Sequence, residues 1–159
     1  MTERNLIHQL KYKDKDYLAS HFAELMAERI VAEGLEPDLV TAVPMYKKKE
    51  RRRGYNQAGL LAKSISLRLN KPYYPDLLIR VCDTPPMSGL GAAQRRKNVQ
   101  GVFTAAKWVK ENIYGKTVLL VDDIFTTGST TEACSDVLKE SGAHRVYVVT
   151  FAAGMDTGQ

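Results

Sequence analysis

The stretch from Val118 to Thr130 constrains the fold of this chain more than any other. It begins within an apolar run at residues 117–121, and the length and β-branched content of this run predict a buried strand. Two adjacent carboxylates, Asp122 and Asp123, close that strand, and a short loop rich in hydroxyl groups follows them. Beyond the loop, apolar residues at one-turn spacing predict a helix that stops at Gly142. Because ligands of α/β proteins bind at the carboxyl ends of strands, this order predicts a binding site at the acidic pair.

The loop itself supplies groups that suit a phosphate monoester. A helix N-terminus carries unpaired N–H groups and a partial positive charge, and Gly128 allows the backbone to approach a ligand closely. The loop also contains four hydroxyl side chains, those of Thr126, Thr127, Ser129 and Thr130. Asp122 and Asp123 would repel a phosphate, so we expect them to bind sugar hydroxyls or Mg²⁺ instead. In the simpler alternative, the acids only end the strand and the hydroxyl groups only cap the helix.

Two other phosphate-binding motifs are absent from the sequence. The loop contains no Lys and does not match G-x-x-x-x-G-K-[ST], so it is not a P-loop. No G-x-G-x-x-G stands at a strand-to-helix turn either. The residues therefore predict a site for a phosphorylated sugar with a metal ion nearby.

The segment 121–130, Val-Asp-Asp-Ile-Phe-Thr-Thr-Gly-Ser-Thr, resembles the phosphoribosyl pyrophosphate (PRPP) motif of type I phosphoribosyltransferases. The resemblance implies that residues 126–130 hold the ribose 5-phosphate. It also implies that Asp122 and Asp123 face the ribose 2- and 3-hydroxyls, with Mg²⁺ as the cofactor. In family members that use 6-oxopurines, an Asp usually occupies the position of Thr126, so the Thr argues against salvage of hypoxanthine or guanine.

A second group of chemistry-bearing residues follows a strand predicted at 39–43. The segment 47–53, Lys-Lys-Lys-Glu-Arg-Arg-Arg, holds six cations and one anion, and the whole chain has a net charge of +5. The basic excess is therefore concentrated in one place, which indicates a local anion site. With a PRPP motif in the same chain, we expect it to bind pyrophosphate; a solvated loop and a contact with nucleic acid are the alternatives. The pyrophosphate-binding residues expected here are Pro44, Met45, Tyr46, Lys47, Lys48 and Lys49.

Two further segments resemble the ComF family, phosphoribosyltransferase-like proteins associated with bacterial competence and DNA uptake. One is Val43-Pro together with the Arg-Gly-Tyr-Asn-Gln of residues 53–57. The other fits R-x-x-N-x-x-G-x-F, with its motif positions at Arg95, Asn98, Gly101 and Phe103. In related transferases the second segment belongs to a flexible hood over the sugar, which implies a hood role for Arg95 and Asn98. Such a lid would exclude water from an oxocarbenium-like centre; a hairpin with a basic tip is the alternative.

The rest of the sequence predicts alternating helices and strands. Apolar periodicity predicts a helix at 16–33 and another from Asn56, as its N-cap, to about residue 70. Short apolar runs predict strands at 77–81 and 146–151. We therefore expect an α/β protein with the type I phosphoribosyltransferase fold: a mainly parallel central sheet flanked by helices, with a flexible hood loop.

Composition indicates one domain over residues 1–159, with an N-terminal extension at 1–15 and a frayed tail at 155–159. The chain is 44% hydrophobic and 26% charged, as globular proteins are. No apolar run approaches the ~20 residues of a membrane span, and no signal-peptide pattern opens the chain, so we expect a cytoplasmic protein without a membrane contact. We expect Cys82 and Cys134 to be reduced thiols in the core.

The ComF resemblance covers residues 5–152 and departs from the family at one point. Fuller ComF proteins carry an N-terminal zinc module with four Cys ligands, and this sequence has no counterpart of it. Two explanations stay open: the chain is a short family member, or an upstream piece is missing.

The residues leave two main functions open. The first is a Mg²⁺-dependent phosphoribosyltransferase that binds PRPP or ribose 5-phosphate and transfers the phosphoribosyl group to a nucleobase. The second is a non-catalytic PRPP-fold protein whose basic segment binds single-stranded DNA or competence proteins. Only Tyr46 and Tyr55 accompany that segment, so few rings are available for base stacking. A generic sugar-phosphate enzyme has no residue of its own in support, and the acceptor base and any homo-oligomer stay undetermined.

Overall fold

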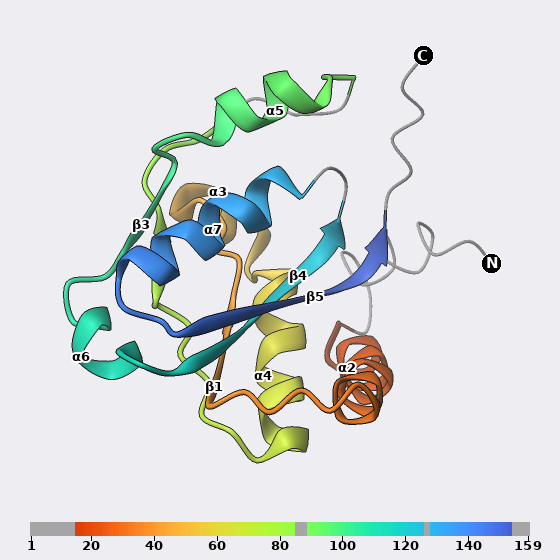
Figure 1. Cartoon of the computed structure of the whole chain (residues 1–159). Helices are drawn as coiled ribbons and strands as arrows, with labels where there is room; N and C mark the ends of the chain where they lie inside the picture. The colour runs from red at the N-terminus through yellow and green to blue at the C-terminus, as the bar shows by residue number, and fades with distance from the viewer. Residues whose placement is uncertain (1–14, 85–88, 126–127, 154–159) are drawn as a thin grey trace.

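The computed structural model describes residues 15–84, 89–125 and 128–153, which form an α/β fold (Figure 1). Its helices are α2 (Lys15–Ala32), α3 (Lys47–Arg53), α4 (Gln57–Leu69), α5 (Ala92–Val99), α6 (Val109–Ile113) and α7 (Ser129–Glu140). Its strands are β1 (Leu39–Ala42), β2 (Leu78–Arg80), β3 (Phe103–Ala105), β4 (Thr117–Phe125) and β5 (Arg145–Ala153). The order along the chain alternates helices and strands, as the periodicity predicted.

The central sheet contains β1, β4 and β5 in that order, and both of its pairings are parallel. In the middle strand, Val118 is paired with Leu39 of β1 and with Val146 of β5. A strand that is covered on both faces and paired on both edges has an almost continuous apolar sequence, which explains the run at 117–121. The predicted α/β class with a parallel sheet is confirmed.

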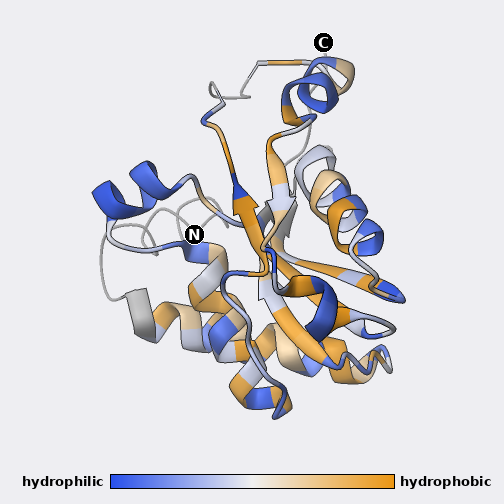
Figure 2. Ribbon diagram, turned by 90° about the vertical axis from the view of Figure 1, so that its left-hand side faces the viewer, coloured by the Kyte–Doolittle hydropathy of each residue, from blue (hydrophilic) through white to orange (hydrophobic). Residues whose placement is uncertain are grey.

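Successive residues of β4 face opposite sides of the sheet, and the core divides into two clusters accordingly. Leu119 and Val121 pack with α2 and α4, whereas Val118 and Leu120 pack with α7. Figure 2 shows these strands as largely hydrophobic ribbons in the centre of the molecule. The helices α4 and α7, which follow β1 and β4 along the chain, thus cover opposite faces. Neighbouring parallel strands with this property form a topological switch point, where ligands of α/β proteins bind.

The region between α4 and α6 forms a second unit, which we call the hood and define as β2, α5 and β3. The two strands pair antiparallel, with Arg80 opposite Phe103. Helix α5 packs against α7, and Arg96 forms an ion pair with Glu132 of α7 at 3.5 Å. The strand predicted at 77–81 is β2, whereas the part expected to be a hood loop contains helix α5 at 92–99 and strand β3 at 103–105.

Three local predictions differ from the structure near the carboxyl ends of the strands. β4 continues through the acidic pair to Phe125, because β5 stays paired with it as far as Ala153. Residues 47–53, for which a solvated loop was one alternative, form helix α3, in keeping with the helix propensity of Lys, Glu and Arg. Asn56 stands at the N-cap position of α4, but its side chain donates to the carbonyl of Val43 at 3.0 Å instead of capping the helix.

The two cysteines have different environments. Cys134 is buried in the core, as expected, whereas Cys82 is exposed, so the prediction of a core thiol is wrong for Cys82. Cys82 lies two residues beyond the end of β2 at Arg80, where the chain has left the two-stranded sheet.

The chain ends carry two predictions that the structure does not address. The extension at 1–15 and the tail at 155–159 lie outside the described residues, except for Lys15 at the start of α2. Within the described ranges, none of the helices combines the length and the apolar character that crossing a bilayer requires.

Gly142 provides a test of the turn between α7 and β5. Its φ is +111°, and a Cβ at this position would lie 3.0 Å from Cδ2 of Tyr114. We expect Gly142→Ala to lower the free energy of unfolding by about 1–3 kcal/mol, because both the backbone conformation and the contact oppose a side chain. Urea denaturation measures this change. Gly91→Ala is the control, since Gly91 has φ −70° and open space around it; equal losses in the two variants would contradict the explanation.

Candidate functional site

Asp122 and Asp123 lie near the carboxyl end of β4 and face opposite sides of the sheet. Asp122 continues the face of Val118 and Leu120, toward α7, and is 8% exposed. Asp123 is on the face of α2 and α4 and is partly buried. The backbone N–H of Asp123 donates to Oδ1 of Asp122 at 2.8 Å. The predicted pair therefore lies near the carboxyl end of the central strand, but its two carboxyl groups have different surroundings.

The surroundings of Asp122 shift its titration strongly. Burial raises the pKa of Asp122 well above its ordinary value, and the neighbouring Asp123 carboxylate raises it further. Burial also raises the pKa of the Cys134 thiol on α7, with a contribution from the charge of Asp122. The guanidinium of Arg80 acts in the opposite direction on both pKa values. A perturbed carboxyl group at the end of a central strand is typical of a functional site.

Arg80 is a site residue that the sequence analysis did not identify. It ends β2, its guanidinium lies 5.6 Å from the centre of the Phe103 ring, and it donates a hydrogen bond to the hydroxyl of Thr84. Its Nε is buried and has no acceptor among the residues that the structure describes. Most buried donors in proteins have a partner, so this one is available to a ligand. The sequence signal was a single cation within the apolar run 77–81.

The predicted phosphate loop is only partly within the described residues, and Thr126 and Thr127 lie outside them. Gly128 has φ +79°, a left-handed conformation that favours glycine, and it occupies the N-cap position of α7. Because glycine has no side chain, no side-chain cap forms at this N-cap. Ser129 is buried and Thr130 is partly buried in the first turn. A helix N-terminus whose N-cap residue makes no side-chain cap, next to the acidic pair, suits an anion.

The lysines predicted to bind pyrophosphate already contact acidic residues. Nζ of Lys47 lies 3.8 Å from Glu50 and 3.5 Å from Asp76. Nζ of Lys49 lies 2.8 Å from Asp83, and this hydrogen bond and charge lower the pKa of the Asp83 carboxyl. The two lysines and their three acidic partners are at least partly exposed, so each ion pair can be exchanged for a bound anion at small energetic cost.

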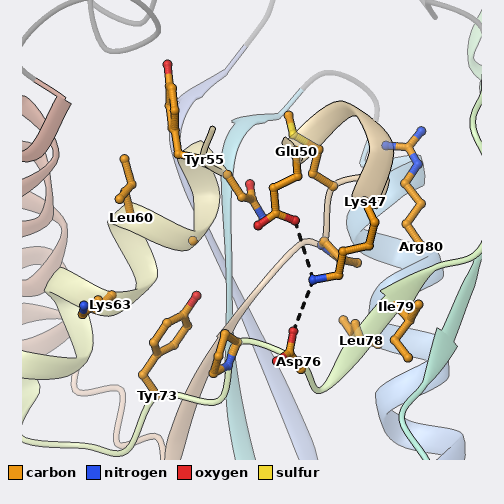
Figure 3. A pocket seen from close by; sticks show the side chains of 15 residues that line it. Lys47, Glu50, Tyr55, Leu60, Lys63, Tyr73, Asp76, Leu78, Ile79 and Arg80 are labelled. Atoms are coloured by element: carbon orange, nitrogen blue, oxygen red, sulfur yellow. Dashed lines mark ion pairs between the residues drawn. The ribbon is translucent and has the colours of Figure 1, made fainter. Parts of the chain in front are cut away.

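A pocket of about 230 Å³ lies beside β1 and contains part of the predicted pyrophosphate segment (Figure 3). Pro44, Met45 and Lys47 line it together with Arg80 and the first turns of α4. Burial, with the carboxylates of Asp76 and Glu50 nearby, raises the pKa of Tyr73 to about 12. The Tyr73 hydroxyl therefore stays protonated at neutral pH and can donate a hydrogen bond into this pocket.

The predicted hood residues Arg95 and Asn98 lie on α5. Arg95 is 8% exposed, and Oδ1 of Asn98 accepts a hydrogen bond from Gln94 at 3.3 Å. Since α5 packs against α7, these residues are near the helix that begins at Gly128. Figure 1 shows α5 on the side of the molecule toward which β4 and β5 point. The hood and the carboxyl ends of the strands therefore share one side of the molecule.

Asp122 and Asp123 offer oxygen ligands that suit Mg²⁺, but they do not form a complete cage. Within residues 15–84, 89–125 and 128–153, no three His, Cys, Asp or Glu side chains gather as a metal site. Mg²⁺ commonly keeps several waters and binds through one or two carboxylates together with phosphate oxygens of a substrate. The residues present fit a metal ion that arrives with a phosphorylated ligand.

Comparison with known proteins gives matches over most of the chain. The phosphoribosyl transferase domain family matches residues 18–158. Competence protein F of Haemophilus influenzae is 38% identical over 112 residues, which cover 70% of this chain and 48% of that protein. DNA utilization protein YhgH of Escherichia coli K12 is 30% identical over 148 residues, covering 90% of this chain and 63% of that protein. The chain thus spans about half to two thirds of these relatives, whose names confirm the resemblance to ComF.

Two solved structures share the fold of this chain. Glutamine PRPP amidotransferase from Bacillus subtilis has a TM-score of 0.57 and 23% identity, over 84% of this chain and 26% of that one. Adenine phosphoribosyltransferase from Thermoanaerobacter pseudethanolicus has a TM-score of 0.57 and 16% identity, over 86% of this chain and 68% of that one. At these identities the likeness concerns the fold alone, and it confirms the predicted phosphoribosyltransferase fold.

Proposed function

This chain belongs to the phosphoribosyl transferase domain family, and we propose that it binds PRPP in the crevice between β1 and β4. The observation that carries the proposal is the acidic pair of the central strand, followed by the Gly128 turn into the uncapped end of α7. PRPP carries a phosphate at one end and a pyrophosphate at the other. The switch point offers an anion-compatible element for each end, namely the start of α7 and the segment 44–49.

The ribose 5-phosphate end would be bound by the loop 126–130, with N–H groups of the first turn of α7 as donors. Asp122 and Asp123 would bind the ribose 2- and 3-hydroxyls. The same two carboxyl groups would hold Mg²⁺ through water or through the ribose, where the ion supplies positive charge to the pyrophosphate.

The pyrophosphate end would be bound by the main chain of residues 44–46 and by the side chains of 47–49. Lys47 and Lys49 would exchange their present carboxylate partners for phosphate oxygens. Arg80 joins this set, because it lines the same pocket as Lys47 and its buried Nε has no acceptor among the described residues. A guanidinium is well suited to phosphate oxygens.

The reaction we propose is transfer of the phosphoribosyl group to a nucleobase. The bond from C1 of the ribose to the pyrophosphate oxygen breaks, a bond from C1 to a nitrogen of the base forms, and pyrophosphate leaves. No covalent intermediate with the protein is needed, so catalysis consists of positioning and charge stabilisation. Arg95 and Asn98 on the hood would help to exclude water from the reacting carbon.

Calorimetric titration with PRPP, with and without Mg²⁺, tests this proposal. We expect binding that requires or is strengthened by Mg²⁺, because the metal reduces repulsion between the pyrophosphate and the acidic pair. Absence of binding at millimolar PRPP would overturn the proposal. If PRPP binds, release of pyrophosphate in the presence of individual nucleobases measures whether transfer occurs.

A second candidate function is binding of single-stranded DNA by α3 without turnover. This helix has no buried residue, and Lys48, Arg51 and Arg52 have no ion pair within the described part of the chain. Figure 2 shows α3 as hydrophilic throughout. The names of the relatives, which refer to competence and DNA utilization, also favour this candidate. Fluorescence anisotropy with an oligonucleotide at low and high salt tests it, since phosphate contacts make the affinity strongly salt-dependent.

A further inference from the structure

Gln57 combines deep burial with an unused hydrogen-bond donor. The residue is 3% exposed and begins helix α4. Its Oε1 accepts a hydrogen bond from Nη1 of Arg53 at 3.5 Å, whereas its Nε2 has no acceptor in the described part of the chain. The contact with Arg53 favours this orientation of the amide, because a guanidinium can only donate. The side-chain nitrogen is therefore a buried donor that the fold itself does not satisfy.

The start of α4, where Gln57 lies, lines the pocket beside β1. The preceding residue, Asn56, donates its side-chain N–H to the carbonyl of Val43, and the N–H of Val43 donates to Val121 at 2.9 Å. These bonds hold the start of α4 against the ends of β1 and β4. The bond to β4 is made at Val121, two residues before Asp123. Since α4 covers the same face of the sheet as Asp123, Gln57 is on that face as well.

The first turn of α4 lacks a side-chain cap, because the Asn56 side chain is engaged with Val43. Its N–H groups carry the partial positive charge of a helix N-terminus. Helix α7 presents the equivalent end on the opposite face of the sheet, after Gly128. The crevice therefore lies between two uncapped helix N-termini, and the one at α4 is additionally equipped with the buried amide of Gln57.

We propose that Nε2 of Gln57, together with the first-turn N–H groups of α4, donates to an oxygen of the pyrophosphate group of the bound ligand. This inference rests on the proposed binding of PRPP and adds a subsite to it. Asn56 ties α4 to the strand end directly before the segment 44–46, so the donor is on the pyrophosphate side of the crevice. Arg53 acts as a positioning residue, because it donates to Oε1 and so leaves Nε2 for the ligand.

An unsatisfied buried donor lowers the stability of the free protein, whereas a purely structural amide would raise it. Replacing the amide by an apolar side chain of similar length distinguishes the two roles. Gln57→Met should leave the melting temperature unchanged or higher, and it should weaken binding of PRPP and of free pyrophosphate about 10-fold or more, both in the presence of Mg²⁺. Binding of ribose 5-phosphate should stay as in the wild type. The more conservative Gln57→Glu, which keeps the shape but removes the donor, should weaken pyrophosphate binding at least as much.

Calorimetry with PRPP, pyrophosphate and ribose 5-phosphate, with thermal unfolding of each variant, separates the possible outcomes. If the wild type binds none of the three ligands, the proposed function itself is wrong. If the wild type binds them and both Gln57 variants bind equally well, the role of Gln57 is wrong. If all three ligands are weakened alike, or if both variants are strongly destabilised, Gln57 does not serve the pyrophosphate specifically. Gln100→Met is the matched control, because Gln100 is exposed on the hood and should change none of these values.

Discussion

Asp123→Asn is expected to weaken the binding of ribose 5-phosphate and of PRPP by about 10- to 100-fold. A hydrogen bond to a charged acceptor contributes about 1.5–3 kcal/mol, which corresponds to one or two powers of ten in affinity. Asparagine keeps the size of the side chain but loses the charge that binds sugar hydroxyls and metal. Calorimetric titration of wild type and variant at the same Mg²⁺ concentration measures the change. Loss of binding to both ligands would place the effect at the ribose 5-phosphate part that they share rather than at the pyrophosphate.

The matched control is Asp136→Asn. Asp136 is an exposed carboxylate in the middle of α7, so the same chemical change occurs there away from the crevice. We expect the affinity of this variant to equal that of the wild type. An unchanged affinity in Asp123→Asn, or an equal loss in both variants, would contradict the role assigned to Asp123.

Asp122→Asn is expected to stabilise the free protein by about 1–2 kcal/mol at neutral pH, which corresponds to roughly 2–8 °C in Tm for a chain of this size. The raised pKa of Asp122, caused by burial and by Asp123, means that the ionised carboxylate opposes folding. The amide is neutral, and its oxygen can still accept the N–H of Asp123. Such a gain would fit the proposed role of Asp122 in ligand binding, since residues kept for function often lower stability.

The sign of the pH dependence follows from the direction of this shift. In the folded state Asp122 holds its proton to a higher pH than in the unfolded state, so the wild type loses stability as pH rises above the unfolded pKa of about 3.9. Below that pH both states are protonated, and the variant should have little advantage. The advantage should grow with pH until the folded pKa is passed, and then level off. Denaturant titrations at a series of pH values measure it; a gain that is independent of pH would contradict the explanation.

The local sequence determines the segment that carries the site. The strand at 117–121, the acidic pair, the Gly128 turn and the helix that follows are each specified by neighbours within a few residues. β-branched runs, glycine at positive φ and helical periodicity act over such short distances. Helix α3 also has a local cause, since its seven consecutive Lys, Glu and Arg residues are good helix formers. The three strands of the central sheet were predicted from local patterns as well, and the errors lie mainly at the strand ends.

The neighbours of the site were decided by packing between segments that are distant in sequence. Arg80 comes from the hood, Gln57 from α4 and Cys134 from α7, and no spacing rule connects them to Asp122. The exposure of Cys82 has the same origin, because the pairing of β2 with β3 ends at Arg80 and leaves Cys82 outside the strand.

The pairing of Asp122 and Asp123 illustrates the division most clearly. Their adjacency is written in the sequence, and it predicts a shared site. Their separation onto two faces follows from the continuation of β4 beyond Val121, which depends on hydrogen bonds to β5. Burial of one carboxyl and partial exposure of the other result from which helices cover each face. Chemical composition is a local property of the chain, whereas burial, and with it pKa and hydrogen-bond satisfaction, arises only when distant segments pack together.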